Sequence, residues 1–177
     1  MRFLTAMLFV ALTVTSVYGQ YPGFEWNKKS TLSTEQQVEF PGTVLEPGVY
    51  IVRLRQTIER RSQVEILNRE ETQLLATVVA VPDHHVRPDD NSDFTYHAVK
   101  RSGPRPVRSW YFPGDLVGLE FVYPAARAKE IAKDSDAHVM ASNSSKDGTI
   151  VAMTPNGKEI VIDDEPISIL TARRKPQ

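Results

Sequence analysis

Short segments of alternating apolar and polar residues dominate the chain between residues 34 and 124. In residues 49–55 apolar side chains alternate with arginines, which predicts a half-buried strand. Residues 73–81 are apolar on both faces and rich in β-branched side chains, as expected of a central strand. Further short segments of this kind lie at 37–40, 63–67, 94–99, 107–112 and 119–123. We therefore expect residues 34–124 to form an all-β domain, an antiparallel sandwich or small barrel of about seven or eight strands.

Proline–glycine pairs punctuate this region between the predicted strands. Pro41-Gly42, Pro47-Gly48 and Pro113-Gly114 each place proline and glycine in the order that the two central positions of a type II turn favour. We expect each pair to reverse the chain between neighbouring strands.

The pattern changes on both sides of the β region. Residues 20–33 show no period and predict an irregular lead-in. After Pro124, residues 125–134 are rich in alanine, lysine and glutamate, which predicts one short helix. Residues 135–177 are mainly polar and predict a linker and flexible tail, with a candidate hairpin at 149–162.

The first 19 residues have the pattern of a secretory signal peptide. Arg2 precedes an uncharged, mostly apolar run at 3–17, and Gly19 ends a short Val-Tyr-Gly phrase. The apolar run is shorter than the roughly 20 residues of a membrane-spanning helix. We expect cleavage before Gln20 and export to the periplasm or the cell exterior, with no transmembrane segment left in the mature chain.

Composition narrows the classes of function. The chain of 177 residues has 21 Lys and Arg against 22 Asp and Glu, a formal net charge of −1. This balance gives no electrostatic reason to expect a nucleic-acid partner. Cysteine is absent, which excludes disulfides, thiolate catalysis and cysteine-ligated metal sites.

Four phrases of the sequence carry a resemblance to a group of proteins. They are TVLEPGVY at 43–50, WYFPGD at 110–115, EFVYP at 120–124 and TPNGKE at 154–159. The chain resembles uncharacterised exported β-rich proteins of acidobacterial genomes. The resemblance implies a bacterial protein with a signal peptide, a β-rich domain, a short helix and a polar tail. It implies no activity and no catalytic residues.

A histidine- and aspartate-rich stretch at 83–93 is the first candidate for chemistry. It holds two histidines and four aspartates, and these residue types ligate divalent metals. His84 and His85, joined by His97 from the next predicted strand, are the candidate metal ligands. The alternative interpretation is a solvated loop between strands.

Aromatic residues are the second candidate, because seven of them fall within residues 94–123. On a strand, Trp110 and Phe112 share one face and Tyr111 takes the other. An exposed set would form a flat platform for a sugar, and we expect Tyr111 to be exposed. With Arg108 nearby, Trp110, Tyr111 and Arg108 are the candidate ligand-binding residues. The alternative is that the aromatic side chains fill the core.

Catalytic motifs such as Gly-x-Ser-x-Gly, His-Glu-x-x-His and the phosphate loop do not occur in this sequence. We therefore expect an exported, non-enzymatic binding or structural module without a cofactor, whose partner is a polysaccharide or another exported protein. Two alternatives stay open at this point. One is a glycan-binding module that uses the aromatic set, and the other is a metal-dependent hydrolase that uses the three histidines.

Overall fold

The computed structural model describes residues 28–58, 60–83, 93–115, 117–143 and 149–162. The predicted signal peptide at 1–19 lies outside these residues, as do His84 and His85. Strands make up 56% of the structure and helix 9%, which confirms the predicted all-β class. The sheets do not close into a barrel, so of the two expected architectures the structure has the sandwich-like one.

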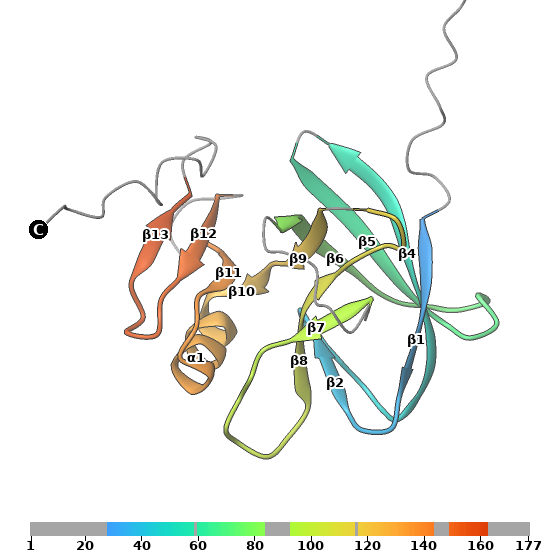
Figure 1. Cartoon of the computed structure of the whole chain (residues 1–177), viewed down its shortest axis with the longest axis horizontal. Coiled ribbons are helices and arrows are strands. Elements are labelled where there is room, and N and C mark those ends of the chain that lie inside the picture. The colour runs from blue at the N-terminus through green and yellow to red at the C-terminus, as the bar shows by residue number, and fades with distance from the viewer. Residues whose placement is uncertain (1–27, 59, 84–92, 116, 144–148, 163–177) are drawn as a thin grey trace, which may run out of the picture.

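Nine strands form the larger sheet, in the order β1-β4-β5-β6-β9-β8-β2-β3 with β7 paired to β8 (Figure 1). Neighbours are antiparallel except for β2 and β8, which are parallel. The strands are β1 (Lys29–Thr34), β2 (Val38–Phe40), β3 (Thr43–Leu45), β4 (Gly48–Ile58), β5 (Arg61–Asn68), β6 (Leu74–Asp83), β7 (Phe94–Tyr96), β8 (Arg105–Trp110) and β9 (Gly118–Phe121).

A smaller sheet with one helix follows the larger sheet. Its order is β10-β11-β12-β13, and its first two strands are parallel because helix α1 crosses between them. No helix in the described part of the chain is long and apolar enough to cross a membrane. The elements are β10 (Tyr123–Pro124), α1 (Ala125–Ser135), β11 (Val139–Ser142), β12 (Ile150–Met153) and β13 (Glu159–Val161).

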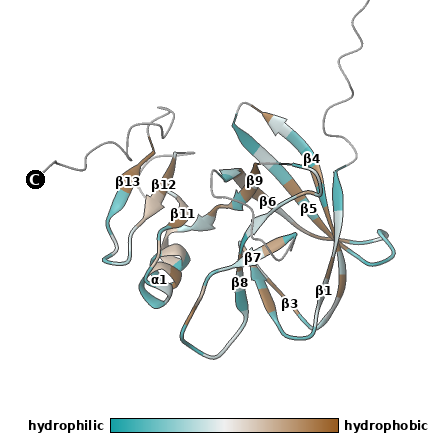
Figure 2. Ribbon diagram, viewed as in Figure 1, coloured by the Kyte–Doolittle hydropathy of each residue, from teal (hydrophilic) through white to brown (hydrophobic). Residues whose placement is uncertain are grey.

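The core follows from alternation along the strands. Val52 and Leu54 of β4 are buried, and so are Val64 and Ile66 of β5 beside them. Figure 2 shows hydrophobic and hydrophilic stretches succeeding one another along the ribbon of the larger sheet. Each fully buried aliphatic side chain contributes about 1.5–3 kcal/mol relative to its exposed state, so this alternation is the main source of stability.

Tyr123 joins the two sheets. Its side chain is fully buried, and its hydroxyl lies 2.8 Å from the main-chain oxygens of both Glu39 and Val107. The hydroxyl has one hydrogen to share between these two acceptors. Arg127 of α1 adds a bidentate pair, with its Nε and Nη2 at 2.8 and 2.7 Å from the two carboxylate oxygens of Glu39. Burial raises the pKa of Tyr123 well above its ordinary value, so the phenol stays a donor.

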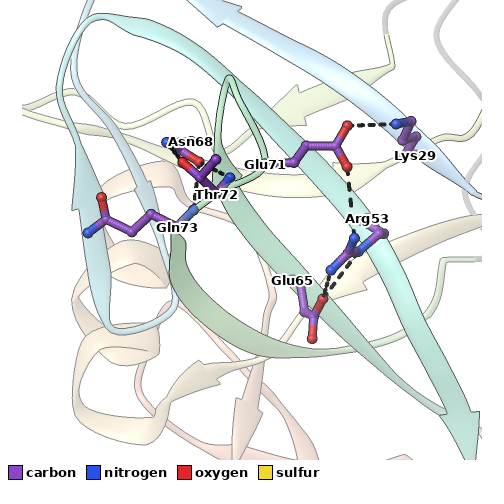
Figure 3. A network of polar contacts seen from close by, with 7 residues as sticks. All are labelled: Lys29, Arg53, Glu65, Asn68, Glu71, Thr72 and Gln73. Atoms are coloured by element: carbon purple, nitrogen blue, oxygen red, sulfur yellow. Dashed lines mark hydrogen bonds and ion pairs between the residues drawn. The ribbon is translucent and has the colours of Figure 1, made fainter.

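Charged side chains cover the outer surface near β1, β4 and β5 (Figure 3). The Nζ of Lys29 lies 2.7 Å from Glu71, and Arg53 pairs with Glu65 at 2.6 Å and with Glu71 at 3.8 Å. In the same view the Asn68 side chain accepts hydrogen bonds from the main-chain N–H groups four and five residues later. The exposed pair of Lys29 with Glu71 contributes little to stability, whereas Arg53 compensates the charge of the buried Glu65.

The structure corrects three sequence expectations. The irregular lead-in expected at 20–33 contains most of β1, whose inward side chains Ser30 and Leu32 are buried. The linker expected from residue 135 contains β11, which pairs with β10 and β12 and packs on α1. β1 has one apolar side chain among six residues and β11 has only four residues, so the local pattern is too weak to predict either strand. Gly42 and Gly114 have the positive φ of a type II turn, whereas Gly48 does not and begins β4.

Substitution of Tyr123 by phenylalanine tests the junction between the sheets. We expect Tyr123→Phe to lower the free energy of unfolding by about 1–3 kcal/mol, because two buried carbonyl oxygens lose a donor. Urea denaturation followed by circular dichroism measures the change. Tyr50→Phe is the matched control, since that hydroxyl donates to the exposed main-chain oxygen of Glu46. Equal losses in the two variants would contradict the assigned role of Tyr123.

Candidate functional site

Trp110 and Tyr111 lie inside the protein, each with only 1% of its surface exposed. The indole Nε1 of Trp110 donates a hydrogen bond of 3.0 Å to Ser30, whose hydroxyl donates to Asp93 at 2.9 Å. Tyr111 donates a hydrogen bond of 2.8 Å to Asp83. The expectation that Tyr111 is exposed is therefore wrong, because its hydroxyl donates a hydrogen bond to the buried carboxylate of Asp83. No flat platform for a sugar forms from this pair.

A buried polar cluster surrounds this tyrosine. Asp83 accepts hydrogen bonds from the hydroxyls of Ser109 and Tyr111 on one carboxylate oxygen, and all three residues are buried. The Nε of Arg108 lies 3.3 Å from the buried carboxylate of Glu120. Arg108, a candidate ligand-binding residue, therefore compensates a buried charge. Burial and the hydrogen bond to Asp83 raise the pKa of Tyr111, which keeps the phenol protonated as a donor.

His97 is the one candidate metal ligand within the described residues, and it lies in the core. It is 5% exposed, its ring packs edge-on against Tyr123 at 6.1 Å between centroids, and its buried Nε2 has no hydrogen-bond partner. Burial, aided by the charge of Arg108, lowers its pKa from 6.5 to about 4. Within the described ranges no three His, Asp or Glu side chains are grouped as metal ligands would be. His84 and His85 lie outside the described residues.

A groove of about 400 Å³ opens where Trp110 and Phe112 meet the ends of neighbouring strands. The two aromatic rings are perpendicular, with their centroids 6.4 Å apart. Strands β4, β5, β6, β8 and β9 all contribute to the walls, so the groove belongs to the larger sheet. Among the described residues, its apolar lining consists of Leu54, Pro82, Trp110, Phe112, Val117 and Leu119.

The polar groups of the groove are paired with one another. The Nζ of Lys28 lies 2.6 Å from the carboxylate of Asp115 and 5.8 Å from the centroid of the Phe112 ring. The hydroxyls of Thr57 and Ser62 lie 3.0 Å apart. Because these groups satisfy each other, the groove presents mostly apolar surface with a few fixed donors and acceptors, the usual character of a small-molecule site.

The sequence pointed to part of this groove. Alternation put Trp110 and Phe112 on one face, and both do line the groove. Lys28, Leu54 and Ser62 were missed as lining residues, because they come from β4, β5 and the position before β1, and no local motif marks them. Only the pairing of β4, β5, β6 and β9 brings them to one place.

The depressed pKa of His97 predicts acid sensitivity. The folded protein binds this proton less readily than the unfolded chain, so stability is complete above pH 6.5 and falls as the pH drops toward 4. The difference between a pKa of 6.5 in the unfolded chain and about 4 in the folded protein corresponds to a loss of about 3 kcal/mol in the free energy of unfolding. His97→Phe, which keeps an aromatic ring against Tyr123, should reduce the loss by that amount. Denaturant titrations at pH 7.0, 5.5 and 4.5 measure it; identical pH profiles for the two proteins would contradict the prediction.

Gly118 tests the packing beneath the buried cluster. A Cβ at this position would lie 2.6 Å from the Tyr111 ring, so Gly118→Ala must displace the tyrosine from Asp83. We expect a destabilisation of at least about 1–3 kcal/mol, the usual cost of overpacking. Gly48→Ala is the control, because its Cβ would approach only the Tyr50 side chain, at 3.3 Å. A thermal melt that shows Gly118→Ala to be as stable as the control would exclude this packing role.

Comparison with known proteins adds no relative to this chain. No protein-family model matches it, and neither a curated protein sequence nor a solved structure gives a significant match. The resemblance to exported acidobacterial proteins therefore stays a prediction.

Proposed function

We propose that this protein is an exported bacterial binding module, without catalytic activity, whose groove holds a small and mainly apolar ligand. The groove is the observation that carries the proposal. Its volume of about 400 Å³ falls within the range of small-molecule sites, roughly 300–1,000 Å³. Among the described lining residues, Pro82, Phe112, Val117 and Leu119 keep exposed apolar surface beside the buried Trp110 and Leu54, so an apolar ligand would gain free energy by leaving water.

The walls of the groove are arranged before any ligand arrives. Part of the lining comes from strands of one hydrogen-bonded sheet, the rest comes from residues next to β1 and between β8 and β9, and the Trp110 indole is held by Ser30. The ion pair between Lys28 and Asp115 holds the region before β1 against the segment that precedes β9. A site that needs no ordering on binding loses less entropy when it is occupied. This rigidity supports a binding role.

The chemistry of the lining favours a small apolar ligand over a polysaccharide. Glycan recognition by stacking needs an exposed flat ring, and Trp110 and Tyr111 are buried. Phe112, which is half-buried, lines the groove with its ring perpendicular to that of Trp110. The N-terminal pattern at 1–19 supports export, which would give the module access to ligands in the periplasm or outside the cell.

A neutral fluorescent probe tests the groove. N-phenyl-1-naphthylamine should bind the whole chain with a saturable rise in fluorescence, because it matches the apolar lining. Val117→Asp places a charge in the lining and should weaken binding about tenfold or more, since apolar contact is replaced by a carboxylate. Val44→Asp is the matched control: Val44 is 47% exposed against 48% for Val117, and it does not line the groove.

Two outcomes would overturn the proposal. The first is that the unaltered protein shows no saturable binding of the probe. The second is that Val117→Asp and Val44→Asp bind the probe equally well while both remain folded by circular dichroism. Phe112→Ala gives a second variant of the lining, and it should weaken binding in the same direction as Val117→Asp.

A further inference from the structure

A second hollow, of about 560 Å³, lies beside the loop that joins β7 to β8. It differs from the apolar groove in character, because arginine, serine and glutamine side chains line it. Tyr96 and His97 form its aromatic side, and Arg101, Ser102, Arg105 and Gln36 are among its polar lining residues. An apolar ligand such as the one proposed for the groove would gain little from these polar side chains.

Arg105 is the central feature of this hollow. Its guanidinium carbon lies over the Tyr96 ring, 4.0 Å from the centroid, in a cation–π contact. The main-chain N–H of Arg105 donates to Gln37 at 2.9 Å, which fixes the residue at the start of β8. A guanidinium in a contact of this kind keeps its N–H edge open to acceptors that lie in its plane.

The guanidinium of Arg105 has no carboxylate partner in the described part of the chain, unlike several other arginines. Arg53 pairs with Glu65, and Arg127 pairs with Glu39 through two hydrogen bonds. These carboxylates neutralise their arginines within the protein. At Arg105 the described contact of the side chain is with a neutral ring, so its charge stays available to a ligand.

Arg101 adds a second positive charge to the same hollow. Its side chain is 71% exposed and lies 3.6 Å from Asp134 of α1, which also accepts the main-chain N–H of Arg101 at 3.1 Å. Asp134 therefore offsets part of this charge and holds the loop against the helix. Ser102 and Gln36 offer neutral hydrogen-bond donors beside it. His97 stays neutral at pH 7, since its pKa is about 4, so the charge of the hollow comes from its two arginines.

We propose that this hollow binds an oxoanion group, a phosphate, sulfate or carboxylate, through the open edge of Arg105. The in-plane fork of a guanidinium matches two oxygens of such a group and forms charge-assisted hydrogen bonds. Arg101 and Ser102 would contact the remaining oxygens. The shared chemistry is a compact group with several negative oxygens, carried either as a free ion or on a small sugar.

Calorimetric titration of the whole chain at low ionic strength tests this proposal with three probes: inorganic phosphate, acetate and glucose 6-phosphate. We expect saturable binding of inorganic phosphate with a dissociation constant on the order of 1 mM. Arg105→Gln should weaken it at least tenfold, and Arg105→Lys should weaken it less, because lysine keeps the charge and loses the fork. Tighter binding of glucose 6-phosphate than of phosphate would identify a ligand-borne group; tighter binding of phosphate would identify a free ion.

Matched variants separate this site from general surface charge. Arg69→Gln removes an exposed arginine from the connection between β5 and β6, and it should leave phosphate binding unchanged. Arg101→Gln, on an exposed loop, should weaken binding severalfold without loss of fold. The proposal is overturned if no probe binds saturably, or if Arg105→Gln and Arg69→Gln bind phosphate equally. Loss of apolar probe binding in Val117→Asp with phosphate binding retained would show that the two sites act separately.

Discussion

The buried hydroxyl of Tyr123 connects the two sheets, and the arrangement of the whole molecule depends on this contact. It reaches one oxygen on β2 and one on β8, the two parallel strands of the larger sheet. Pro106 lies opposite Glu39 in this register and has no main-chain N–H to donate. The phenol places a donor beside that residue, and the bidentate pair of Arg127 with Glu39 then anchors α1 to the same strand.

Strand β8 carries this junction at one end and the apolar groove at the other. Val107 accepts a hydrogen bond from Tyr123, and three residues later Trp110 forms part of the groove. Between them Ser109 donates to the buried Asp83. Alternate residues of one strand thus serve the core, the groove and the polar cluster, since successive side chains point to opposite faces.

The two proposed sites differ in the ligand they favour, because their cationic side chains have different partners within the protein. In the apolar groove the lysine is already paired with an aspartate, so burial of apolar surface is the main gain open to a ligand. In the hollow near β7, Arg105 lies over a neutral ring and keeps its charge, so an anion gains most. Sites with these opposite chemistries can be removed one at a time by single substitutions.

Local pattern determined much of this fold, because strand alternation and turn chemistry are properties of neighbouring residues. The predicted all-β class and the buried face of β4, with Val52 and Leu54, follow from such alternation. The pairing of β1 with β4 and of β11 with β12 does not, since it depends on partners distant in the chain. The burial of Tyr111 was decided in the same way, by a carboxylate 28 positions earlier. The sequence alone determined the β class and most of the central strands, through local alternation; tertiary contacts decided the strands β1 and β11 and which side chains meet, because hydrogen bonds and packing act through space.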